Sequence, residues 1–479
     1  MRPEIVLRYV GLILLINALF LLISSIISLV QADGAFNYLM YSTTVALLLG
    51  LFPLLFVPPT MEITNKEGLF IIVAGWLISC LVGIMPFVLW GGPFTFTNAW
   101  FESVSGFTTT GSSILAEIES IPKGLLFWRA STHWIGGVGI IVFVLAALPS
   151  MGTASMVLYR TETSALAIKD FRYRTRETLK IILYVYIGLT AIETIALMIA
   201  GLSPFDAVTH SFATIATGGF STKNTSVAFF NSVAVESIII LFMLLSGIHF
   251  GLLFMFVSGK IRPLYESTIV RYYLISILLG TFAVAINICG STYDSWGEAI
   301  RYAAFQVVSI GTSTGFANAD SSLWPAFSML VLLFFTLQCA CAGSTSGGIK
   351  VDRIVLFCKA LLREVLYLRH PRGVFMIKID NSNLGDQNVN SAIIFILLYF
   401  AILFVSTSII TFVGVDLMTA FSGVAAAMGN VGPGFGLVGS MNNFSALPSL
   451  AKWVLSFDML LGRLEIYSLI LFFTIRQWK

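Results

Sequence analysis

Long apolar stretches follow one another along this chain. A helix needs roughly 20 apolar residues to cross the hydrocarbon core of a bilayer. Ten stretches approach that length: residues 5–31, 38–57, 67–91, 124–149, 177–201, 234–258, 271–291, 324–349, 391–413 and 448–475. The sequence therefore predicts an all-α polytopic membrane protein with ten spans.

The composition supports this prediction and excludes several other classes of protein. Hydrophobic residues make up 57% of the 479 residues and charged residues only 11%, so membrane lipids must surround most of the surface. The net charge is +3, and no basic patch is interleaved with aromatic residues, so we expect no nucleic-acid partner. The five cysteines lie in or beside apolar stretches and suggest neither a disulfide framework nor a zinc site.

The positions of the basic residues predict the orientation in the membrane. Ten spans place both termini on one side, and 21 of the 27 Lys and Arg residues fall in the termini and connections of that side. Cytoplasmic connections are enriched in Lys and Arg. We therefore expect both termini to be cytoplasmic.

The four outer connections each contain an apolar piece that is too short to cross a bilayer. These pieces are residues 98–107, 204–215, 296–310 and 417–428. Irregular backbone is tolerated at membrane depth only where it is buried in protein or lines water. We expect each piece to be a half-helix that enters the membrane, after which the chain returns to the same side.

A segment rich in glycine, threonine or serine follows each half-helix. The four glycine segments, numbered in chain order, are Thr109-Thr110-Gly111-Ser112, Ala216-Thr217-Gly218-Gly219, Ser313-Thr314-Gly315-Phe316 and Asn430-Val431-Gly432-Pro433-Gly434. Their central glycines are taken as Gly111, Gly218, Gly315 and Gly432, and each is followed by a break in the next apolar stretch, at Gly137, Gly247, Gly343 and Gly462. This recurrence indicates internal repeats.

The repeats divide the chain into five parts. Residues 1–60 form two extra N-terminal transmembrane helices, and residues 61–158, 159–262, 263–378 and 379–479 form pore repeats 1 to 4. Each repeat reads as helix, pore helix and helix. We expect four such tandem repeats around one pseudo-fourfold pore.

Glycine segments in this arrangement suit a cation filter. Rings of backbone carbonyls can replace the hydration shell of a potassium ion. Glycine visits positive φ at little steric cost, and half-helices point partly negative C-terminal ends at the ion. A single such segment is more often a simple turn, but four in register favour a filter. The expected ligands of K+, the permeant ion, are Thr109, Thr110, Gly111, Ala216, Thr217, Gly218, Ser313, Thr314, Gly315, Asn430, Val431 and Gly432.

These motifs resemble the Trk/Ktr/HKT superfamily of potassium transporters over essentially the whole chain. The matching runs are residues 105–111, 216–221, 311–316, 429–434 and 342–350. The resemblance implies potassium uptake across the bacterial inner membrane, a homodimer with one pore per protomer, and a cytoplasmic regulatory nucleotide-binding ring protein (TrkA-like). Only the fourth segment approaches the full Thr-Val-Gly-Tyr-Gly pattern of potassium channels, so we expect weaker discrimination against sodium.

The run Gly343-Ser344-Thr345-Ser346-Gly347-Gly348 lies at membrane depth without a helical pattern. We expect a loop below the filter, and the superfamily implies that this region, with Lys350, is a gate. The alternative is a face of small residues that packs helices, although such faces recur every four residues. In the superfamily a glycine-rich lead-in is usual, whereas Gln338 and Cys339 stand there in this chain.

Arg463 lies within the tenth stretch, where a charge costs roughly 2.5 to 3.5 kcal/mol on insertion scales. We expect it to face the pore, repel ions and act with the gate, as the superfamily's pore arginine implies. A structural ion pair is the alternative, and pairing with Glu465 is not assured by their spacing. Two further residues have two open readings each: Arg129 either snorkels or buttresses the first segment, and Glu102 either attracts cations or stabilises its helix.

Two other functions remain as alternatives to a gated pore. A sodium- or proton-coupled cation carrier would place ionisable residues at the midplane, where few acidic groups lie. A polytopic membrane enzyme would use His133 or His249, yet their nearest polar neighbours, such as Thr132 and Ser246, are too few. No Walker motif or phosphate-binding GxGxxG occurs, so we expect no organic cofactor in this chain.

Overall fold

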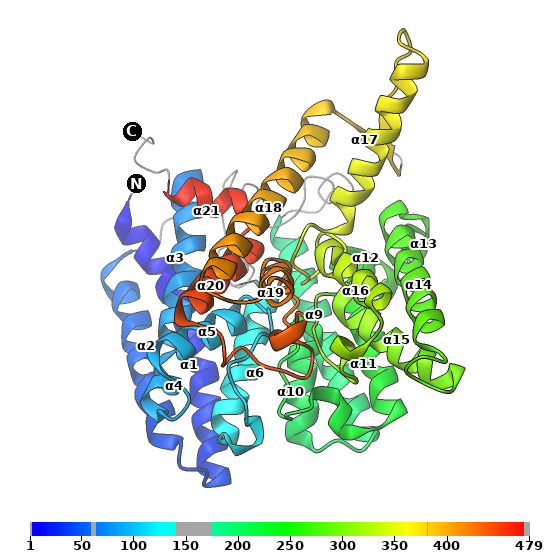
Figure 1. Cartoon of the computed structure of the whole chain (residues 1–479). Coiled ribbons are helices and arrows are strands. Elements are labelled where there is room, and N and C mark those ends of the chain that lie inside the picture. Colours follow the sequence, from blue (N-terminus) through cyan, green and yellow to red (C-terminus); the bar gives the residue numbers. More distant parts are fainter. Residues whose placement is uncertain (1, 59–63, 140–174, 381, 474–479) are drawn as a thin grey trace.

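The computed structural model describes residues 2–58, 64–139, 175–380 and 382–473. Long helices run side by side through it (Figure 1). Within the described ranges, the helices long and apolar enough to cross a membrane are α1 (Pro3–Gln31), α2 (Phe36–Phe56), α3 with α4 (Asn65–Gly83 and Met85–Trp90), α9 (Thr175–Ile199), α14 (Thr268–Ile288) and α18 (Asp386–Phe412). A further span is possible where α11 (Val233–Ser246) and α12 (Phe250–Val257) meet at a bend of 107°.

Three of the predicted spans are interrupted rather than continuous. The stretch 234–258 breaks directly before Gly247, and 448–475 divides into α20 (Ser449–Arg463) and α21 (Ile466–Phe473), one residue after Gly462. In the stretch 324–349, α16 (Ala326–Gln338) ends before Gly343, because Cys339 already adopts a positive φ of 54°. The breaks predicted at Gly247, Gly343 and Gly462 are therefore confirmed, although the one predicted at Gly343 begins earlier, at Cys339.

The fourth predicted span is described only in its first part, as α6 (Lys123–Val138). Residues 140–149 of that span lie outside the described residues. So do the predicted domain boundaries at 60/61 and 158/159 and most of the basic connection 158–180.

The four predicted half-helices are present, with ends within two residues of those expected. They are α5 (Phe96–Phe107), α10 (Pro204–Ile215), α15 (Trp296–Gly311) and α19 (Leu417–Gly429). Each begins at a residue whose side-chain oxygen accepts a backbone hydrogen bond from the first turn: Thr95, Ser203, Ser295 and Asp416. Such caps satisfy amides that a helix leaves unpaired at its start. The bond from the Thr419 amide also lowers the pKa of the exposed Asp416 carboxyl below its usual value.

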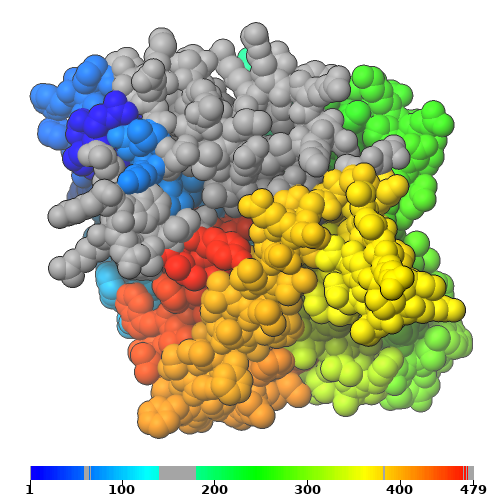
Figure 2. All heavy atoms as spheres, turned by 90° about the horizontal axis from the view of Figure 1, so that it is seen from above, coloured from blue at the N-terminus to red at the C-terminus, as the bar shows by residue number. Residues whose placement is uncertain are grey.

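The four half-helices are linked through their neighbours into a closed cycle. Helix α6 packs against α10, α11 against α15, α16 against α19, and α20 against α5. The same rule holds for all four pairs. For example, α10 contacts α6, which is the helix that follows the previous half-helix, α5, in the chain. Seen from above, the visible colours accordingly follow one another around the molecule in chain order, from blue through green and yellow to red (Figure 2).

Helices α1 and α2 pack against each other outside this cycle. Helix α1 also contacts α3 and α6, so the N-terminal pair lies against the first part of the cycle. Buried polar groups fix this contact, because the Asn17 Nδ2 atom donates to Ser79 Oγ at 3.0 Å.

One end of the molecule carries a projecting arm. It consists of α17 (Val351–Arg369), the antiparallel strands β1 (Ile377–Ile379) and β2 (Ser382–Leu384), and the start of α18, and it extends past the rest at the end where α1 begins (Figure 1). Arg363 Nη1 lies 2.5 Å from Asp386 Oδ1 and so joins α17 to α18. The remaining short elements are α13 (Arg262–Glu266) and the 3-10 turns Ile118–Ser120, Ser226–Phe230, Ser321–Leu323 and Gly436–Val438.

Candidate functional site

The four glycine segments share one backbone conformation. Each has a residue with positive φ just after its half-helix: Thr109 at 55°, Thr217 at 53°, Ser313 at 58° and Asn430 at 51°. Two residues later each has a glycine with positive φ: Gly111 at 83°, Gly219 at 77°, Gly315 at 81° and Gly432 at 100°. Such a φ is strained for L side chains, which explains why glycine stands there in all four segments.

This conformation corrects the predicted register of the second segment by one residue. The residue between the two positive φ values donates its amide to the carbonyl five residues earlier in every segment, from Thr110, Gly218, Thr314 and Val431. Gly219, not Gly218, is therefore the counterpart of Gly111, and Ala216 is the C-cap residue of α10. Two adjacent glycines cannot be told apart by spacing alone. The prediction from sequence therefore chose Gly218 as the central glycine, one residue before Gly219.

The segments approach one another closely in a cycle. A Cβ added to Gly111 would lie 2.1 Å from Gly218 O, and one on Gly219 would lie 2.1 Å from Thr314 O. A Cβ on Gly315 would lie 1.9 Å from Val431 O, and one on Gly432 would lie 2.6 Å from Thr110 O. Each glycine thus touches a carbonyl of the next segment, and the fourth segment returns to the first.

Side-chain hydrogen bonds join the first and fourth segments although they lie 320 residues apart. Asn430 Nδ2 donates to Thr110 Oγ1 at 3.0 Å, and Ser112 Oγ donates to the Gly432 carbonyl at 2.9 Å. Asn430 also donates to Met459 O at 3.0 Å, which ties the same residue to α20. The cycle of segments is therefore closed by specific polar contacts as well as by packing.

An ion pair supports the first two segments from behind. Arg129 Nε lies 2.6 Å from Glu102 Oε1, and both side chains are buried. Arg129 Nη1 donates to Ser221 O at 3.0 Å, and its guanidinium lies 3.4 Å from the centre of the Phe220 ring. Glu102 also accepts from the Ile114 amide at 2.9 Å. Of the two alternatives for Arg129, its contacts favour support of the segments over a side chain that reaches the membrane interface. Glu102 is the buried partner of Arg129 and not an exposed carboxylate that would attract cations.

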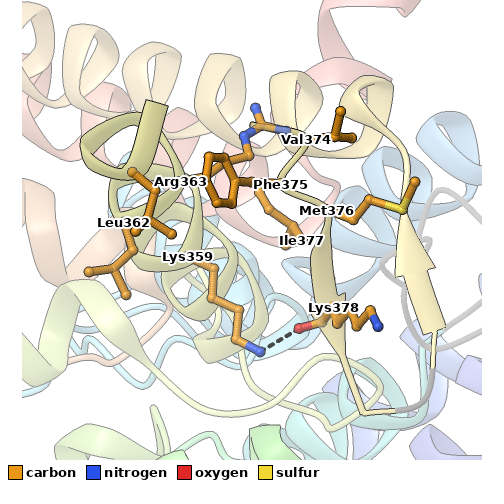
Figure 3. A pocket seen from close by; sticks show the side chains of 9 residues that line it. Lys359, Leu362, Arg363, Val374, Phe375, Met376, Ile377 and Lys378 are labelled. Carbon is orange, nitrogen blue, oxygen red and sulfur yellow. Dashed lines mark hydrogen bonds between the residues drawn. The ribbon is translucent and has the colours of Figure 1, made fainter. Parts of the chain in front are cut away.

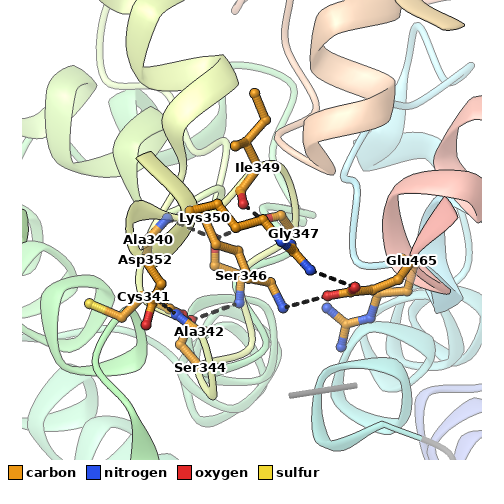
Figure 4. Close-up of polar contacts among 12 residues, drawn as sticks. Ala340, Cys341, Ala342, Ser344, Ser346, Gly347, Ile349, Lys350, Asp352 and Glu465 are labelled. Atoms are coloured by element: carbon orange, nitrogen blue, oxygen red, sulfur yellow. Dashed lines mark hydrogen bonds and ion pairs between the residues drawn. The ribbon is translucent and has the colours of Figure 1, made fainter. Parts of the chain in front are cut away.

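The predicted break in the eighth stretch is present as an irregular loop between α16 and α17, from Cys339 to Lys350 (Figure 4). Ser313 Oγ donates to Ser346 Oγ at 2.9 Å, and Thr345 Oγ1 donates to Ile215 O at 3.1 Å. A Cβ added to Gly347 would lie 2.5 Å from Asn430 Oδ1. The loop therefore lies directly against the third and fourth segments and against the end of α10.

Arg463 connects this loop to the end of α6. Its Nη1 donates to Thr345 O at 2.5 Å, and its Nη2 donates to Gly136 O at 2.6 Å and Gly137 O at 3.1 Å. Gly136 and Gly137 lie in the last turn of α6, where carbonyls lack the usual amide donor four residues later, although Gly136 O also accepts from the Gly139 amide at 3.0 Å. The arginine thus holds backbone oxygens from two elements that are far apart in the sequence.

Sequence reasoning missed the ion pairs at the start of α17. Glu465 Oε2 lies 2.6 Å from Arg353 Nη2, and Glu465 Oε1 lies 3.8 Å from Lys350 Nζ (Figure 4). Asp352 accepts from the Ala342 amide at 2.6 Å. Glu465 therefore pairs with Lys350, at the end of the loop, and with Arg353, at the start of α17, rather than with Arg463. The available signal was the three charged residues among positions 350 to 353, at the end of the loop.

The two histidines weighed for catalysis sit in packed surroundings. The His133 ring stacks on Phe220 with ring centres 4.0 Å apart. His249 caps α12 by accepting from the Gly251 amide at 3.0 Å, and a Cβ on Gly343 would lie 2.1 Å from its ring. Among the described residues, no group of three or more His, Cys, Asp or Glu side chains could hold a metal ion.

Comparison with known proteins identifies the family. The family model described as "TrkH: Cation transport protein" matches residues 43–289 and 292–478. The chain belongs to the TrkH family. It is therefore a multi-pass membrane protein that transports cations and not an enzyme, and the histidine-based alternative is set aside.

Relatives within the TrkH family match along the whole chain. The Trk system potassium uptake protein TrkH of Escherichia coli (strain K12) is 38% identical, with 98% of each chain covered. The protein of the same name from Vibrio parahaemolyticus is 37% identical over 100% of both chains. The crystal structure of the potassium transporter TrkH from Vibrio parahaemolyticus superposes with a TM-score of 0.90 at 34% identity, again over 100% of both chains.

Proposed function

We propose that this chain carries potassium ions across the bacterial inner membrane through one pore, with the four glycine segments as its filter. The observation that carries the proposal is the closed cycle in which each positive-φ glycine touches a carbonyl of the next segment. The names of the relatives, which are potassium uptake proteins, support the choice of ion.

The chemistry of the segments fits a weakly hydrated monovalent cation. The segments contain no carboxylate, so an ion would be held by backbone and hydroxyl oxygens rather than by full negative charges. Carbonyls of Thr110, Gly218, Thr314 and Val431 lie at the contacts between segments and are the first candidates. The half-helices end at the segments, so the negative ends of their dipoles favour cations there.

The arrangement of the chain around this pore follows from the same contacts. In the proposal, residues 61–158, 159–262, 263–378 and 379–479 form four repeats around a pseudo-fourfold axis, and residues 1–60 lie outside. The shared caps of the half-helices and the cyclic packing from α6 to α10 onward support this division.

We place the gate in the loop from Cys339 to Lys350 together with Arg463. The loop lies against the third and fourth segments and the end of α10, and Arg463 binds its Thr345 carbonyl. The ion pairs of Lys350 and Arg353 with Glu465 attach the end of the loop to the C-terminal helices. A movement of α17 would therefore be transmitted to the loop.

The proposal includes a homodimer and a cytoplasmic nucleotide-binding ring protein as regulator, with both termini in the cytoplasm. We place the site of regulation at the arm formed by α17 and its hairpin. The arm projects at the end where α1 begins, and α17 starts directly after the loop. A cavity of about 570 Å³ in this arm is lined by Lys359, Arg363, Lys378 and apolar side chains (Figure 3). This basic character fits a cytoplasmic position.

Uptake by the purified chain in proteoliposomes tests the function. We expect radioactive rubidium, a substitute for potassium, to enter faster than sodium, and an imposed proton gradient of either sign to leave the rubidium rate unchanged once the membrane potential is clamped. Protein-free liposomes provide the background. Equal rates for the two ions, or rubidium uptake that requires the proton gradient, would contradict a potassium-preferring pore and favour a coupled carrier.

A further inference from the structure

The second glycine segment differs from the others at one position. The residue between its two positive-φ residues is Gly218, whereas the other segments have Thr110, Thr314 and Val431 there. A glycine at this place does not serve a left-handed conformation, since only Thr217 and Gly219 have positive φ in this segment. Another reason for the missing side chain is therefore needed.

The missing volume is filled by a histidine from the neighbouring helix. A Cβ added to Gly218 would lie 2.3 Å from Nδ1, 2.6 Å from Cγ and 2.7 Å from Cε1 of His133, which is fully buried on α6. All three distances are too short for a real Cβ, so any side chain at 218 and the imidazole at 133 exclude each other.

The same imidazole also helps to hold the residue that follows the segment. The ring of Phe220 stacks on His133 with 4.0 Å between centres and 15° between planes, and the Arg129 guanidinium lies 3.4 Å from the centre of the Phe220 ring. Two groups this close to one ring centre must lie on its opposite faces, because they would otherwise overlap. Phe220 is therefore held between two side chains one turn apart on α6, and Arg129 is fixed by Glu102 at 2.6 Å.

We propose that His133 is a positioning residue of the filter, which sets the Gly218 carbonyl in place by filling the space behind Gly218 and clamping Phe220. This inference rests on the proposed function, because it takes the segments to be the filter. The Gly218 carbonyl lies beside Gly111 of the first segment, so a shift of the second segment changes a contact within the cycle. The imidazole thus acts on ion preference through the backbone and does not contact the ion.

The test compares four full-length variants and one control by rubidium uptake and by the rubidium-to-sodium uptake ratio in proteoliposomes. His133→Ala leaves a cavity behind Gly218 and should lower the rubidium-to-sodium ratio about threefold. His133→Gln, whose side chain has a similar volume and ends in a planar amide, should keep the ratio within about twofold of wild type. Gly218→Ala overpacks the site and should lower rubidium uptake about tenfold, and His133→Ala combined with Gly218→Ala should recover most of that loss. Gly297→Ala, with nothing within 4 Å of its added Cβ, is the matched control.

Rescue in the double variant is the decisive readout, since a general loss of stability would add rather than cancel. A folded His133→Ala variant with the wild-type ratio, or a double variant as impaired as Gly218→Ala, would overturn the inference. If His133→Ala does not elute as a folded protein, His133→Asn takes its place and must lower the ratio. The filter itself is tested separately through Gly432, so failure of the histidine result alone would leave the proposed function standing.

Discussion

Arg463 donates a hydrogen bond from Nη1 to the backbone carbonyl of Thr345, with 2.5 Å between the two atoms. This contact joins the end of α20 to the middle of the loop between α16 and α17. The same guanidinium holds Gly136 O at 2.6 Å, so one cation bridges the loop and the end of α6. In the proposed pore, this cation is both a latch on the loop and a barrier to permeant ions.

Replacing Arg463 by Ala should therefore increase ion flux. The loop loses its latch, and a positive charge that repels cations more strongly in a low-dielectric passage than in water is removed. We expect rubidium uptake in proteoliposomes to rise about threefold or more, with the rubidium-to-sodium ratio unchanged because the filter is intact. Arg262→Ala is the control, because Arg262 is an exposed surface arginine on α13. Wild-type flux in a folded Arg463→Ala variant would remove this residue from the proposed gate.

Shortening the loop should have a stronger effect. Deletion of residues 344–347 removes the Thr345 carbonyl that Arg463 holds and the Ser346 hydroxyl that accepts from Ser313. Irregular backbone at membrane depth must form its hydrogen bonds with protein or with pore water. In the proposed pore this loop lies across the path of the ion, so a shorter loop should leave a larger opening. We predict higher uptake with unchanged ion preference, and uptake that no longer responds to the cytoplasmic partner.

Two results would argue against this account of the loop. A deletion variant that folds and inserts but still needs the partner for full flux would show that regulation does not act through the loop. Ser344→Ala is the control for disturbance within the loop, because among the described residues the Ser344 hydroxyl bonds only to Cys341 O and the Ser346 amide. That substitution should leave flux within about twofold of wild type.

The buried ion pair of Glu102 and Arg129 should matter mainly for stability. Glu102→Gln leaves the Arg129 guanidinium buried without its counter-charge, which we expect to destabilise the protein by about 3 kcal/mol. Thermal unfolding of the detergent-purified protein measures the effect. Glu266→Gln, which breaks an exposed pair with Arg262, should change stability by only about 0.5 kcal/mol. Equal melting temperatures for the two variants would contradict the buttressing role of the pair.

The sequence predicted the four half-helices well because their signals are local. Each combines a capping residue such as Ser203 at its start with a glycine segment at its end, and the observed bounds lie within two residues of those expected. The breaks at Gly247 and Gly462 were predicted for the same reason, since glycine weakens a helix wherever it stands.

The features that sequence reasoning missed depend on tertiary contacts. The register of the second segment was misplaced because Gly218 and Gly219 are adjacent. Only the structure shows that Gly219 is needed for its positive φ, whereas Gly218 is needed because His133 leaves no room for a side chain. Glu465 pairs with Arg353 across 112 residues, and no spacing rule predicts such a contact. Asp352 was overlooked because its partner is a backbone amide within the irregular loop.

In the proposed pore the cycle of glycine segments selects the ion, and a substitution at Gly432 tests this role. Gly432 has a φ of 100° and its added Cβ would meet Thr110 O at 2.6 Å, the mildest such approach in the cycle. Gly414 has nearly the same φ of 97° but nothing within 4 Å. Gly414→Ser therefore reproduces the backbone strain without touching the filter.

The measurement is the rubidium-to-sodium uptake ratio of Gly432→Ser and Gly414→Ser in proteoliposomes, with size-exclusion profiles to confirm folding. We predict that Gly432→Ser lowers the ratio about tenfold, because a side chain displaces the carbonyls at the contact between the fourth and first segments, whereas Gly414→Ser keeps the wild-type ratio. A folded Gly432→Ser variant with an unchanged ratio would contradict the assignment of these segments as the filter.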